Sequence, residues 1–594
     1  LIVPRPRLVR ANGRAYAWPN RVRVQARTEL ERKSAKQVTT FLSRYGISAE
    51  VGATAADVRL DVGPNRVPGV GSEGYAMSAS SAGVRISANS GAGAFYALQS
   101  LEQLSTHDSG GLRTRGVVVR DWPRYAWRGM HLDVSRHFFG TSVIERYIAA
   151  AAHYKLNVFH WHLTDDQAWR IDIPRYPRLA HIGSCHRGRC ESYTAAQVRE
   201  VVRFARDRYV TIVPEIEIPG HSQAALRAYP QYACDRASEA NVYCPTESTI
   251  AFLQHILDDV TTLFPGPYVH IGGDEVDFGP WRRSAFVHTL MRREGMTGYP
   301  QVQAYFTRRM QSFLRARGKR VVGWDEILEP GTAPSAVVMS WRGTAMAVRS
   351  VRRGHDAVVA TDGPLYFDAF QGERAQEPAA TAHMSTLAQV YDFNPTPDGL
   401  RPIEMQRILG AQATMWTERI STPAHLFYMA FPRELALAEI LWTPSALKNW
   451  DSFLARLPPQ LAWLAREDYA YRIPAPRIAV TGGRINFLGV AGSVQSANAW
   501  TDAKRVWVGL SEPARGAVLR YTIDGSVPTA ASAEYAAPLL LPVDTGKRLK
   551  IAVVAFLPHG GASSVSRCTI THASTRDVLA RRGASRTWAA LVSP

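Results

Sequence analysis

Residues 268–276 read YVHIGGDEV, an apolar run that ends in two glycines and two adjacent carboxylates, Asp274 and Glu275. A short run of β-branched and aromatic residues that is closed by glycine is typical of a buried strand. The same form, an apolar run followed by polar side chains, recurs along the chain between about residues 125 and 445. This repetition is the feature from which the fold can be predicted.

Eight strand-like runs of this kind alternate with longer segments of helical period. They begin at Arg128, Asn157, Thr211, Tyr268, Arg320, Ala336, Asp356 and Ala411. In the segments between them, such as SVIERYIAAAAHYK at residues 142–155, apolar residues recur at three- and four-residue steps, the period of an amphipathic helix. Eight alternations of strand and helix predict a (β/α)8 TIM barrel; an open doubly wound sheet, which usually has fewer strands, is the alternative.

Polar and aromatic residues follow each run, at the strand ends where the catalytic groups of a barrel lie. They are Arg136, Asp165, His221, Asp274, Glu275, Trp324, Asp325, Trp341, Asp362, Tyr366, Asp368, Trp416 and Glu418. A single polar residue at such a place is usually a helix cap. Eight ends in register predict a lined pocket, in which Trp324, Trp341 and Trp416, together with Trp161, offer flat walls for a sugar.

The segments on either side of the barrel have other patterns. Residues 1–120 carry strand signals, such as RVRVQAR and DVRLDVG, and one helix-like segment, GAGAFYALQSLEQLS, and so predict a small α/β domain. Residues 121–470 hold the predicted barrel. In residues 471–594, short alternating runs with turn signals, such as RVWVGLS and RLKIAVVAFLP, predict an all-β sandwich domain.

The composition is that of an ordinary globular protein with a basic surface. The 594 residues, 46% of them hydrophobic and 20% charged, are enough for two or three domains with a large core. The formal net charge is +19, but arginines such as Arg5, Arg7 and Arg10 are scattered in ones and twos rather than gathered in a block. We therefore predict a solvated basic surface and no nucleic-acid partner.

Four of the five cysteines fall in two close pairs, Cys185 with Cys190 and Cys234 with Cys244. Zinc ligation is the competing interpretation, but neither pair has the short spacing of a zinc knuckle, and no second ligand pair lies at a matching distance. We predict two local disulfides. The remaining cysteine, Cys568, is expected to be a buried free thiol.

The chain begins at Leu1 and shows no basic segment followed by an apolar stretch, so we expect that an export signal has already been removed. No apolar run reaches the roughly 18 residues that a membrane-spanning helix needs. We expect a soluble, exported protein, periplasmic or secreted.

The adjacent carboxylates raise a problem of geometry. In an ordinary glycosidase two carboxylates flank the scissile bond, and they normally come from different strands. Adjacent strand residues point to opposite faces, so Asp274 and Glu275 are poorly placed to serve as acid and nucleophile. One of them can be the acid, and the nucleophile must then come from elsewhere.

HIGGDEV resembles the signature of the glycoside hydrolase family 20 β-N-acetylhexosaminidases. LDVSRHFF, NVFHWHLTDDQAWR, EIEIPGH, WDEIL and MWTE look like other blocks of that family, in the same order. GAGAFYALQSLEQL is similar to the helix of the family's N-terminal domain, and YTIDGSVPTAASAEY to the C-terminal β-domain of its chitobiase-like members. The resemblance covers nearly the whole chain.

The resemblance implies substrate-assisted catalysis, which removes the need for a protein nucleophile. The 2-acetamido carbonyl of the substrate would attack the anomeric carbon to form an oxazolinium intermediate. Glu275 would be the general acid and then the base, and Asp274 would orient the acetamido group and stabilise its developing charge. Tyr366 would hydrogen-bond the acetamide oxygen, while His221 and Asp165 would form a relay behind Glu275.

The resemblance also implies a set of sugar-binding residues. Trp324, Trp341 and Trp416 would enclose the sugar and its methyl group. Arg136 would bind the 3- and 4-hydroxyls, which closes the pocket behind the non-reducing sugar. The 4- and 6-hydroxyls would be bound by Asp368 and Glu418.

Together these features predict an exo-acting, retaining β-N-acetylhexosaminidase that removes terminal N-acetylglucosamine, and also N-acetylgalactosamine as an option, from chitooligosaccharides or glycans. No metal or organic cofactor is implied, and the oligomeric state is left open. Two alternatives stand beside this function. One is a family member that releases a disaccharide, like a lacto-N-biosidase; the other is a non-catalytic sugar-binding protein on an inactivated barrel.

Overall fold

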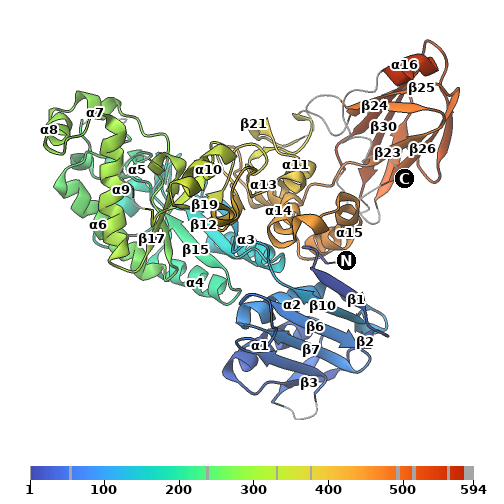
Figure 1. Ribbon diagram of the computed structural model, residues 1–594, viewed down its shortest axis with the longest axis horizontal. Helices are drawn as coiled ribbons and strands as arrows, with labels where there is room; N and C mark the ends of the chain where they lie inside the picture. The colour runs from blue at the N-terminus through green and yellow to red at the C-terminus, as the bar shows by residue number, and fades with distance from the viewer. Residues whose placement is uncertain are drawn as a thin grey trace.

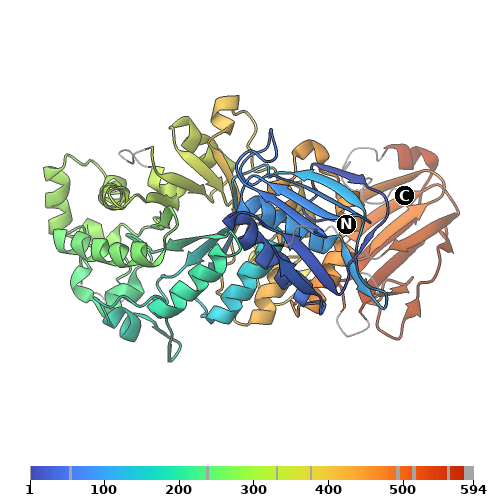
Figure 2. The same ribbon diagram turned by 90° about the horizontal axis from the view of Figure 1, so that it is seen from below.

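The computed structural model describes residues 2–52, 56–235, 240–328, 332, 334–374, 377–489, 496–511, 517–557 and 562–580. Figure 1 shows a barrel surrounded by helices, an N-terminal sheet domain below it and a C-terminal β-domain at the far end. In the view from below, the N-terminal domain lies in front, with most of the barrel on one side and the C-terminal domain on the other (Figure 2). The boundaries near residues 120 and 470 stay predictions.

The central unit is a closed barrel of eight parallel strands that pair in chain order. The strands are β11 (Trp127–Asp133), β12 (Val158–His162), β15 (Thr211–Glu215), β16 (Tyr268–His270), β17 (Arg320–Trp324), β18 (Val337–Ser340), β19 (Asp356–Val359) and β22 (Ile408–Ala413). Each coincides with one of the eight predicted runs. The barrel closes where β22 pairs with β11, which confirms the TIM barrel and rules out the open sheet.

Helices and short strands connect and cover the barrel strands (Figure 1). The helices are α3 (Thr141–His153), α4 (Ala195–Arg206), α5 (Gln223–Ala228), α6 (Glu247–Leu263), α7 (Gly279–Arg283), α8 (Ala285–Arg293), α9 (Tyr299–Arg315), α10 (Thr344–Arg352), α11 (Leu387–Asp392), α12 (Pro402–Met405), α13 (Pro423–Ala430), α14 (Arg433–Trp442) and α15 (Trp450–Arg466). The short strands are β13 (Cys185–His186), β14 (Arg189–Cys190), β20 (Ala369–Phe370) and β21 (Thr381–Met384).

The interior of the barrel contains an apolar cluster that is separate from the core between strands and helices. Its buried members are Trp127, Val158, Val213, Val322, Trp324, Val337, Met339, Val358 and Ala360. Neighbouring residues such as Val321 and Val338 belong to the other core. This alternation follows from strand geometry, since successive side chains point to opposite faces, and it explains why the barrel strands carry apolar residues on both faces.

The N-terminal domain is a seven-stranded sheet with two helices. Its strand order is β1-β10-β6-β7-β5-β3-β4. The elements are β1 (Leu8–Ala11), β3 (Arg21–Gln25), α1 (Glu29–Ser43), β4 (Ser48–Val51), β5 (Val58–Val62), β6 (Tyr75–Ser80), β7 (Gly83–Ala88), α2 (Gly91–Gln103) and β10 (Val117–Asp121), with β2 (Tyr16–Ala17), β8 (Ser105–Asp108) and β9 (Gly111–Thr114) in a small side sheet. The sequence predicted α2 but missed α1.

Helix α1 was missed because it is polar over most of its length. Only a narrow stripe that includes Ala35, Val38 and Phe41 is buried. A capping box marks its start, where the Thr28 side chain accepts from the backbone of Glu31 and the Glu31 side chain accepts from the backbone of Thr28. This local signal identifies the helix where hydrophobic periodicity is weak.

The C-terminal domain consists of two sheets, as an all-β sandwich requires. One sheet has the order β23-β26-β29 and the other β24-β25-β31-β30-β27-β28. The elements are β23 (Arg477–Thr481), β24 (Ile485–Gly489), β25 (Ser496–Thr501), β26 (Arg505–Ser511), β27 (Val518–Thr522), β28 (Ala533–Glu534), β29 (Leu539–Pro542), β30 (Arg548–Phe556), β31 (Ser566–His572) and a short α16 (Thr575–Ala580).

The two predicted disulfides are present, Cys185–Cys190 and Cys234–Cys244. Cys568 is a buried free thiol, also as predicted. Within the described ranges we find no helix with the length and apolar character that crossing a membrane demands.

Buried polar contacts join the N-terminal domain to the barrel. Lys155 Nζ lies 3.3 Å from Asp121 Oδ2, and both side chains are fully buried. Trp442 Nε1 donates to the same oxygen at 2.9 Å. Buried charges of this kind are stable only when they are paired, so these contacts fix where the domain docks.

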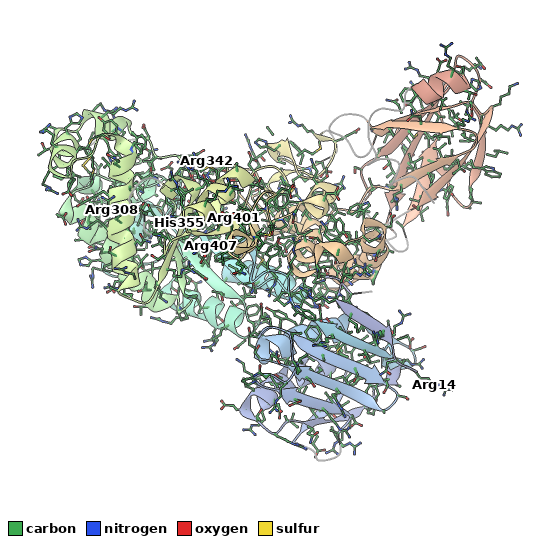
Figure 3. The ribbon with its side chains drawn as sticks, in the orientation of Figure 1. Arg14, Arg308, Arg342, His355, Arg401 and Arg407 are labelled. Carbon is green, nitrogen blue, oxygen red and sulfur yellow. A yellow bond between two sulfur atoms is a disulfide. The ribbon has the colours of Figure 1, made fainter. Side chains whose placement is uncertain are left out.

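Arginine side chains lie on both the N-terminal domain and the barrel. Figure 3 shows the labelled Arg14 at the outer edge of the N-terminal domain, and Arg342 and Arg401 on the barrel. This matches the scattered arginines in the sequence.

Candidate active site

A cavity of about 280 Å³ opens at the carboxyl ends of the barrel strands. Most residues predicted for the site line it; the exceptions are Asp165, which lies directly behind His221, and the buried Asp325 and Trp161. The lining comprises Arg136, His221, Asp274, Glu275, Trp324, Trp341, Asp362, Tyr366, Asp368, Thr381, Ala382, His383, Trp416 and Glu418. The structure thus brings together residues that span almost 300 positions of the chain.

Asp274 and Glu275 reach the same cavity, although adjacent strand residues would point apart. Strand β16 ends at His270, and the chain then turns through Gly272 and Gly273, whose φ angles are 64° and 97°. Glu275 itself has a left-handed φ of 48°. The expectation that the two carboxylates face opposite sides is therefore wrong, because strand geometry stops four residues before the first of them.

The turn depends on glycine for a second reason. A Cβ on Gly272 would lie 1.7 Å from Glu217 Oε2, and a Cβ on Gly273 would lie 2.9 Å from Ile327 Cγ2. A side chain at either position would have to displace these atoms and adopt a positive φ, which residues other than glycine rarely do. The two glycines thus allow both the backbone turn and the close packing beneath it.

The two carboxylates differ in their surroundings. The Asp274 side chain is 14% exposed and that of Glu275 62% exposed. Burial raises the pKa of Asp274 to about 6, against the lowering influence of His221. Among the described residues, the buried Asp274 Oδ1 has no hydrogen-bond partner. A buried acceptor without a donor is costly, so this oxygen is ready to receive a donor from a bound molecule.

His221 connects the pair to Asp165. Its Nε2 lies 3.6 Å from Asp274 Oδ2 and 3.7 Å from Glu275 Oε2. Its Nδ1 lies 3.3 Å from Asp165 Oδ1 and 3.3 Å from Asp166 Oδ2. Burial disfavours the imidazolium, but the two aspartates outweigh it and raise the pKa of His221 well above its ordinary value. The sequence reasoning missed Asp166, although the DD doublet in HLTDDQ was a visible signal.

Arg136 connects the relay to the far end of the cavity. Its Nη2 lies 2.7 Å from Asp165 Oδ2, and its Nη1 lies 3.7 Å from Glu418 Oε1. Gln167 Oε1 accepts from its Nε at 2.8 Å, a contact that the sequence reasoning missed. The guanidinium also lies 5.1 Å from the centroid of the Trp416 ring, within cation–π range.

Three tryptophans form the walls, and two of them are held by carboxylates. Trp324 Nε1 donates to Glu215 Oε1 at 2.9 Å. Trp341 Nε1 lies 3.1 and 3.2 Å from the two oxygens of Glu326. Burial and the nearby Asp274 raise the pKa of Glu326 to about 7. The ring of Trp416 lies 6.0 Å from that of Trp324.

The prediction that Trp161 belongs to these walls is wrong. Its side chain is fully buried and packs against Tyr193 and Phe264, on the helix side of the barrel. His160 and His162 point into the barrel, so the residue between them must point out.

The last wall comes from the segment that follows β19. Tyr366 forms a β-bridge with Thr414 at the end of β22. Burial raises the pKa of Asp368 to about 7, and its Oδ1 has no hydrogen-bond partner in the part of the chain that the structure describes. Strand β21 contributes Thr381 and His383 to the rim; no motif or periodicity in the sequence pointed to them.

Histidines and carboxylates also gather beneath the cavity, where His160 and His270 lie next to Glu215. These are the residue types of a metal site. The carboxylate that they share already accepts from Trp324 and contacts His162, so we assign it to a hydrogen-bonded network and not to a ligand set.

Three family models match the chain. Glycosyl hydrolase family 20, catalytic domain, matches residues 125–445, and glycosyl hydrolase family 20, domain 2, matches residues 1–122. The chitobiase/beta-hexosaminidase C-terminal domain matches residues 498–566.

Individual relatives agree with these matches. A beta-hexosaminidase of Porphyromonas gingivalis is 38% identical over 519 residues, which are 83% of this chain and 64% of that protein; the chain thus spans less than two thirds of this relative. A beta-hexosaminidase of Vibrio furnissii is 34% identical, with 65% of this chain and 67% of that protein covered. The crystal structure of an exo β-N-acetylglucosaminidase from Vibrio harveyi, in complex with N-acetylglucosamine, is similar with a TM-score of 0.74 and 30% identity, covering 79% of this chain and 78% of that chain.

Proposed function

Because the chain belongs to glycosyl hydrolase family 20, we propose that it is an exo-acting, retaining β-N-acetylhexosaminidase. Its substrates are oligosaccharides with a terminal N-acetylglucosamine or N-acetylgalactosamine, such as chitooligosaccharides. The observation that carries the proposal is the unpartnered, buried Oδ1 of Asp274 next to the exposed carboxyl of Glu275. An acetamido N–H is a donor of the right kind for that oxygen, and a sugar without the acetamido group has none to offer.

The reaction proceeds in two steps. Glu275 donates a proton to the glycosidic oxygen while the C1–O bond breaks, and the acetamide oxygen of the substrate forms a bond to C1 from the opposite face. Asp274 accepts from the acetamide N–H and stabilises the positive charge on the resulting oxazolinium ring. Water then attacks C1, Glu275 takes its proton, and the ring opens, so that two inversions give net retention.

Tyr366 and the tryptophans position the nucleophile. The Tyr366 hydroxyl donates to the acetamide oxygen and holds it near C1, while Trp324, Trp341 and Trp416 enclose the acetamide methyl group and the sugar ring. Holding a reacting group in place in this way can contribute roughly 7 to 11 kcal/mol to lowering a barrier. The alternation of flat apolar walls with single polar groups is typical of small-molecule sites.

Exo action follows from the closed end of the cavity. Arg136 binds the 3- and 4-hydroxyls, and its guanidinium is held by Asp165 and Glu418. Asp368 and Glu418 receive the 4- and 6-hydroxyls, for which the unpartnered Oδ1 of Asp368 is available. A further sugar beyond the 4-hydroxyl would meet these side chains.

The His221 relay supports the acid. Asp165 and Asp166 keep His221 protonated, so that a fixed positive charge faces both catalytic carboxylates. This charge attracts both carboxylates and so holds them in place through the proton transfers of both steps.

The two alternative functions receive less support. A cavity of about 280 Å³ lies near the lower end of the range of roughly 300 to 1,000 Å³ for small-molecule pockets, which suits one sugar better than a disaccharide. A non-catalytic sugar-binding protein has no use for Asp274, Glu275 and Tyr366 in one cavity.

We also propose that the protein works outside the cytoplasm. Both disulfides are of the kind that persists in oxidising compartments. A thiol count on protein taken directly from its native compartment tests this point, and five free thiols would contradict it.

The test of the activity is a rate comparison across three aryl β-glycosides, the N-acetylglucosaminide, the N-acetylgalactosaminide and the glucoside. We expect turnover of the first, slower or equal turnover of the second, and none of the glucoside. A thiazoline mimic of the intermediate should inhibit strongly. Rapid hydrolysis of the glucoside would instead indicate a protein nucleophile, and a digest of chitotriose that releases only disaccharide would favour the first alternative.

A further inference from the structure

A layer of buried polar side chains lies directly beneath the cavity, and the mechanism above does not use it. It consists of Glu215 at the end of β15 and four histidines on the neighbouring strands, namely His131, His160, His162 and His270. All five side chains are fully buried. Buried polar groups are expensive unless they are well paired, so a layer of five requires a physical reason.

Glu215 lies at the centre of this layer. Its Oε2 is 2.5 Å from His162 Nδ1 and 3.0 Å from His160 Nε2, and its Oε1 is 2.7 Å from His270 Nδ1. The indole of Trp324 donates to Oε1 at 2.9 Å. One carboxylate therefore holds the wall of the sugar pocket and the histidine layer at the same time.

His162 carries the connection upward. Its second nitrogen, Nε2, lies 3.0 Å from Asp165 Oδ2, and Asp165 Oδ1 lies 3.3 Å from His221 Nδ1. A continuous path thus runs from Glu215 through His162, Asp165 and His221 to the catalytic carboxylates.

The charges along this path alternate in sign. Burial alone would raise the pKa of Glu215, but His270, His162 and His160 hold it well below its usual range. Burial disfavours charge on His162 as well, yet Glu215 and Asp165 raise its pKa to about 10. Arg136 and the two histidines beside Asp165 overcome its burial and hold its pKa well below the ordinary value. Each group in the path is therefore kept ionised by its neighbours.

We propose that Glu215 and His162 are positioning residues for the hydrolysis, which fix Asp165, and through it His221, against the catalytic pair, while Glu215 also holds Trp324 in the pocket wall. The inference rests on the proposed function. Neither residue touches the substrate. They form a rigid layer that fixes the relay and the tryptophan wall relative to each other. A displacement of reacting groups by about 1 Å can lower a rate 100-fold.

The surroundings of the path are mostly charged or titratable. Glu215 is faced by His160 and His162 on β12, His270 on β16 and Glu217 on its own strand segment, with His131 on β11 beside His162. Asp165 is faced by Arg136, His162 and His221. A variant that tests the role of this charge must remove the charge and change the side-chain volume little. Glu215→Gln meets both conditions.

For Glu215→Gln we expect kcat on a substrate with a poor leaving group to fall about 10- to 100-fold, with a smaller change in KM. The pH profile should change as well. Glu215 raises the pKa of His162, so its loss lowers that pKa, and His162 becomes neutral at a pH where it is still charged in the natural protein. The basic limb of kcat/KM should therefore move to lower pH by about one unit or more.

His162→Gln gives a second measurement in case the first variant folds poorly. Its kcat loss and pH shift should be similar to or smaller than those of Glu215→Gln, which also loses a contact to Trp324. The double variant should lose little more than Glu215→Gln alone, because His162 acts through the same contact to Asp165. Additive losses would show that the two residues act separately and would overturn the inference.

Glu434→Gln is the control for changing a buried carboxyl that lies away from the path. Glu434 lies on α14, is also fully buried, and has a pKa that burial raises to about 8, but it does not line the cavity. This variant should keep the kcat and pH profile of the natural protein. If Glu215→Gln keeps them too, or if Glu434→Gln loses as much, Glu215 has only a structural role. Failure of the natural protein to hydrolyse any N-acetylhexosaminide contradicts the proposed function instead, so the two failures are distinct.

Discussion

The two halves of the barrel interior are built from the same eight strands but have opposite chemistry. The half toward the strand starts contains valines such as Val158, Val322 and Val337. The half toward the strand ends contains Glu215 and the buried histidines, with the cavity above them. Apolar packing in the first half stabilises the fold, whereas paired charges in the second half fix the positions of the side chains below the cavity. The contrast teaches that stability and catalysis can be changed separately in this molecule, and the predictions below test that separation.

The largest expected effect is that of Glu275→Gln, at the top of the polar half. Removing the proton donor should lower kcat/KM about 10²- to 10⁴-fold on substrates with poor leaving groups, and much less on activated aryl glycosides, which leave without a proton. The thermal unfolding temperature should not change, since this side chain is 62% exposed. Equal losses on both kinds of substrate would rule out the acid role.

The next effect is a pH dependence that comes from Asp274. In the proposed mechanism this carboxylate works only when ionised, and burial raises its pKa to about 6. Because the pKa is raised, the ionised form is complete only about one unit above it, and kcat/KM should fall about tenfold per pH unit as the pH drops below it. A profile of kcat/KM from acid to neutral pH measures this. An acid limb that starts near pH 4, the ordinary value for aspartate, would contradict the prediction.

Val322→Ala tests the apolar half. Val322 is fully buried inside the barrel, and its truncation should lower the free energy of unfolding by about 2 kcal/mol through lost burial and a small cavity. The kcat should stay within about twofold, since no polar contact of the site is touched. Denaturant midpoints and steady-state rates on the same preparation make the comparison. A large loss of kcat at unchanged stability would mean that the two halves are not separable.

The smallest expected effect is that of Glu326→Gln at the wall. The amide keeps an oxygen for Trp341 Nε1 but cannot ionise, whereas the pKa of Glu326 is about 7. Above that pH the lost charge is worth roughly 1 kcal/mol, or about fivefold in KM. The kcat should hold, because the indole binds ground and transition states alike. Trp341→Phe, which removes the donor altogether, should raise KM to the same extent. An unchanged KM in both variants would show that this contact does not contribute to substrate binding.

Much of the barrel and its pocket could be predicted from sequence, because both depend on hydrophobic periodicity. All eight barrel strands and nearly all the pocket residues follow from apolar runs that end in polar groups. Asp274 and Glu275 were misjudged because the strand ends at His270. The glycine pair at residues 272 and 273 was the available signal that strand geometry stops before the carboxylates. Trp161 was misplaced, although the alternation of side chains along a strand puts it on the face opposite to His160 and His162.

Other features depend on contacts between distant segments, which a single sequence does not contain. The rim from β21, with Thr381 and His383, has neither period nor motif. The pairing of Glu215 with Trp324 joins residues 109 positions apart. Such contacts arise only when the closed barrel brings the strand ends together.

The close approach of Gly272 to Glu217 limits how the pocket can be redesigned. In a saturation library of the pocket, Gly272 should be among the positions where no replacement is recovered, although it binds no sugar. Directed evolution toward a new acceptor or a transglycosidase must therefore draw its variation from the rim, where β21 presents its side chains to solvent, and leave the turn beneath the catalytic pair untouched.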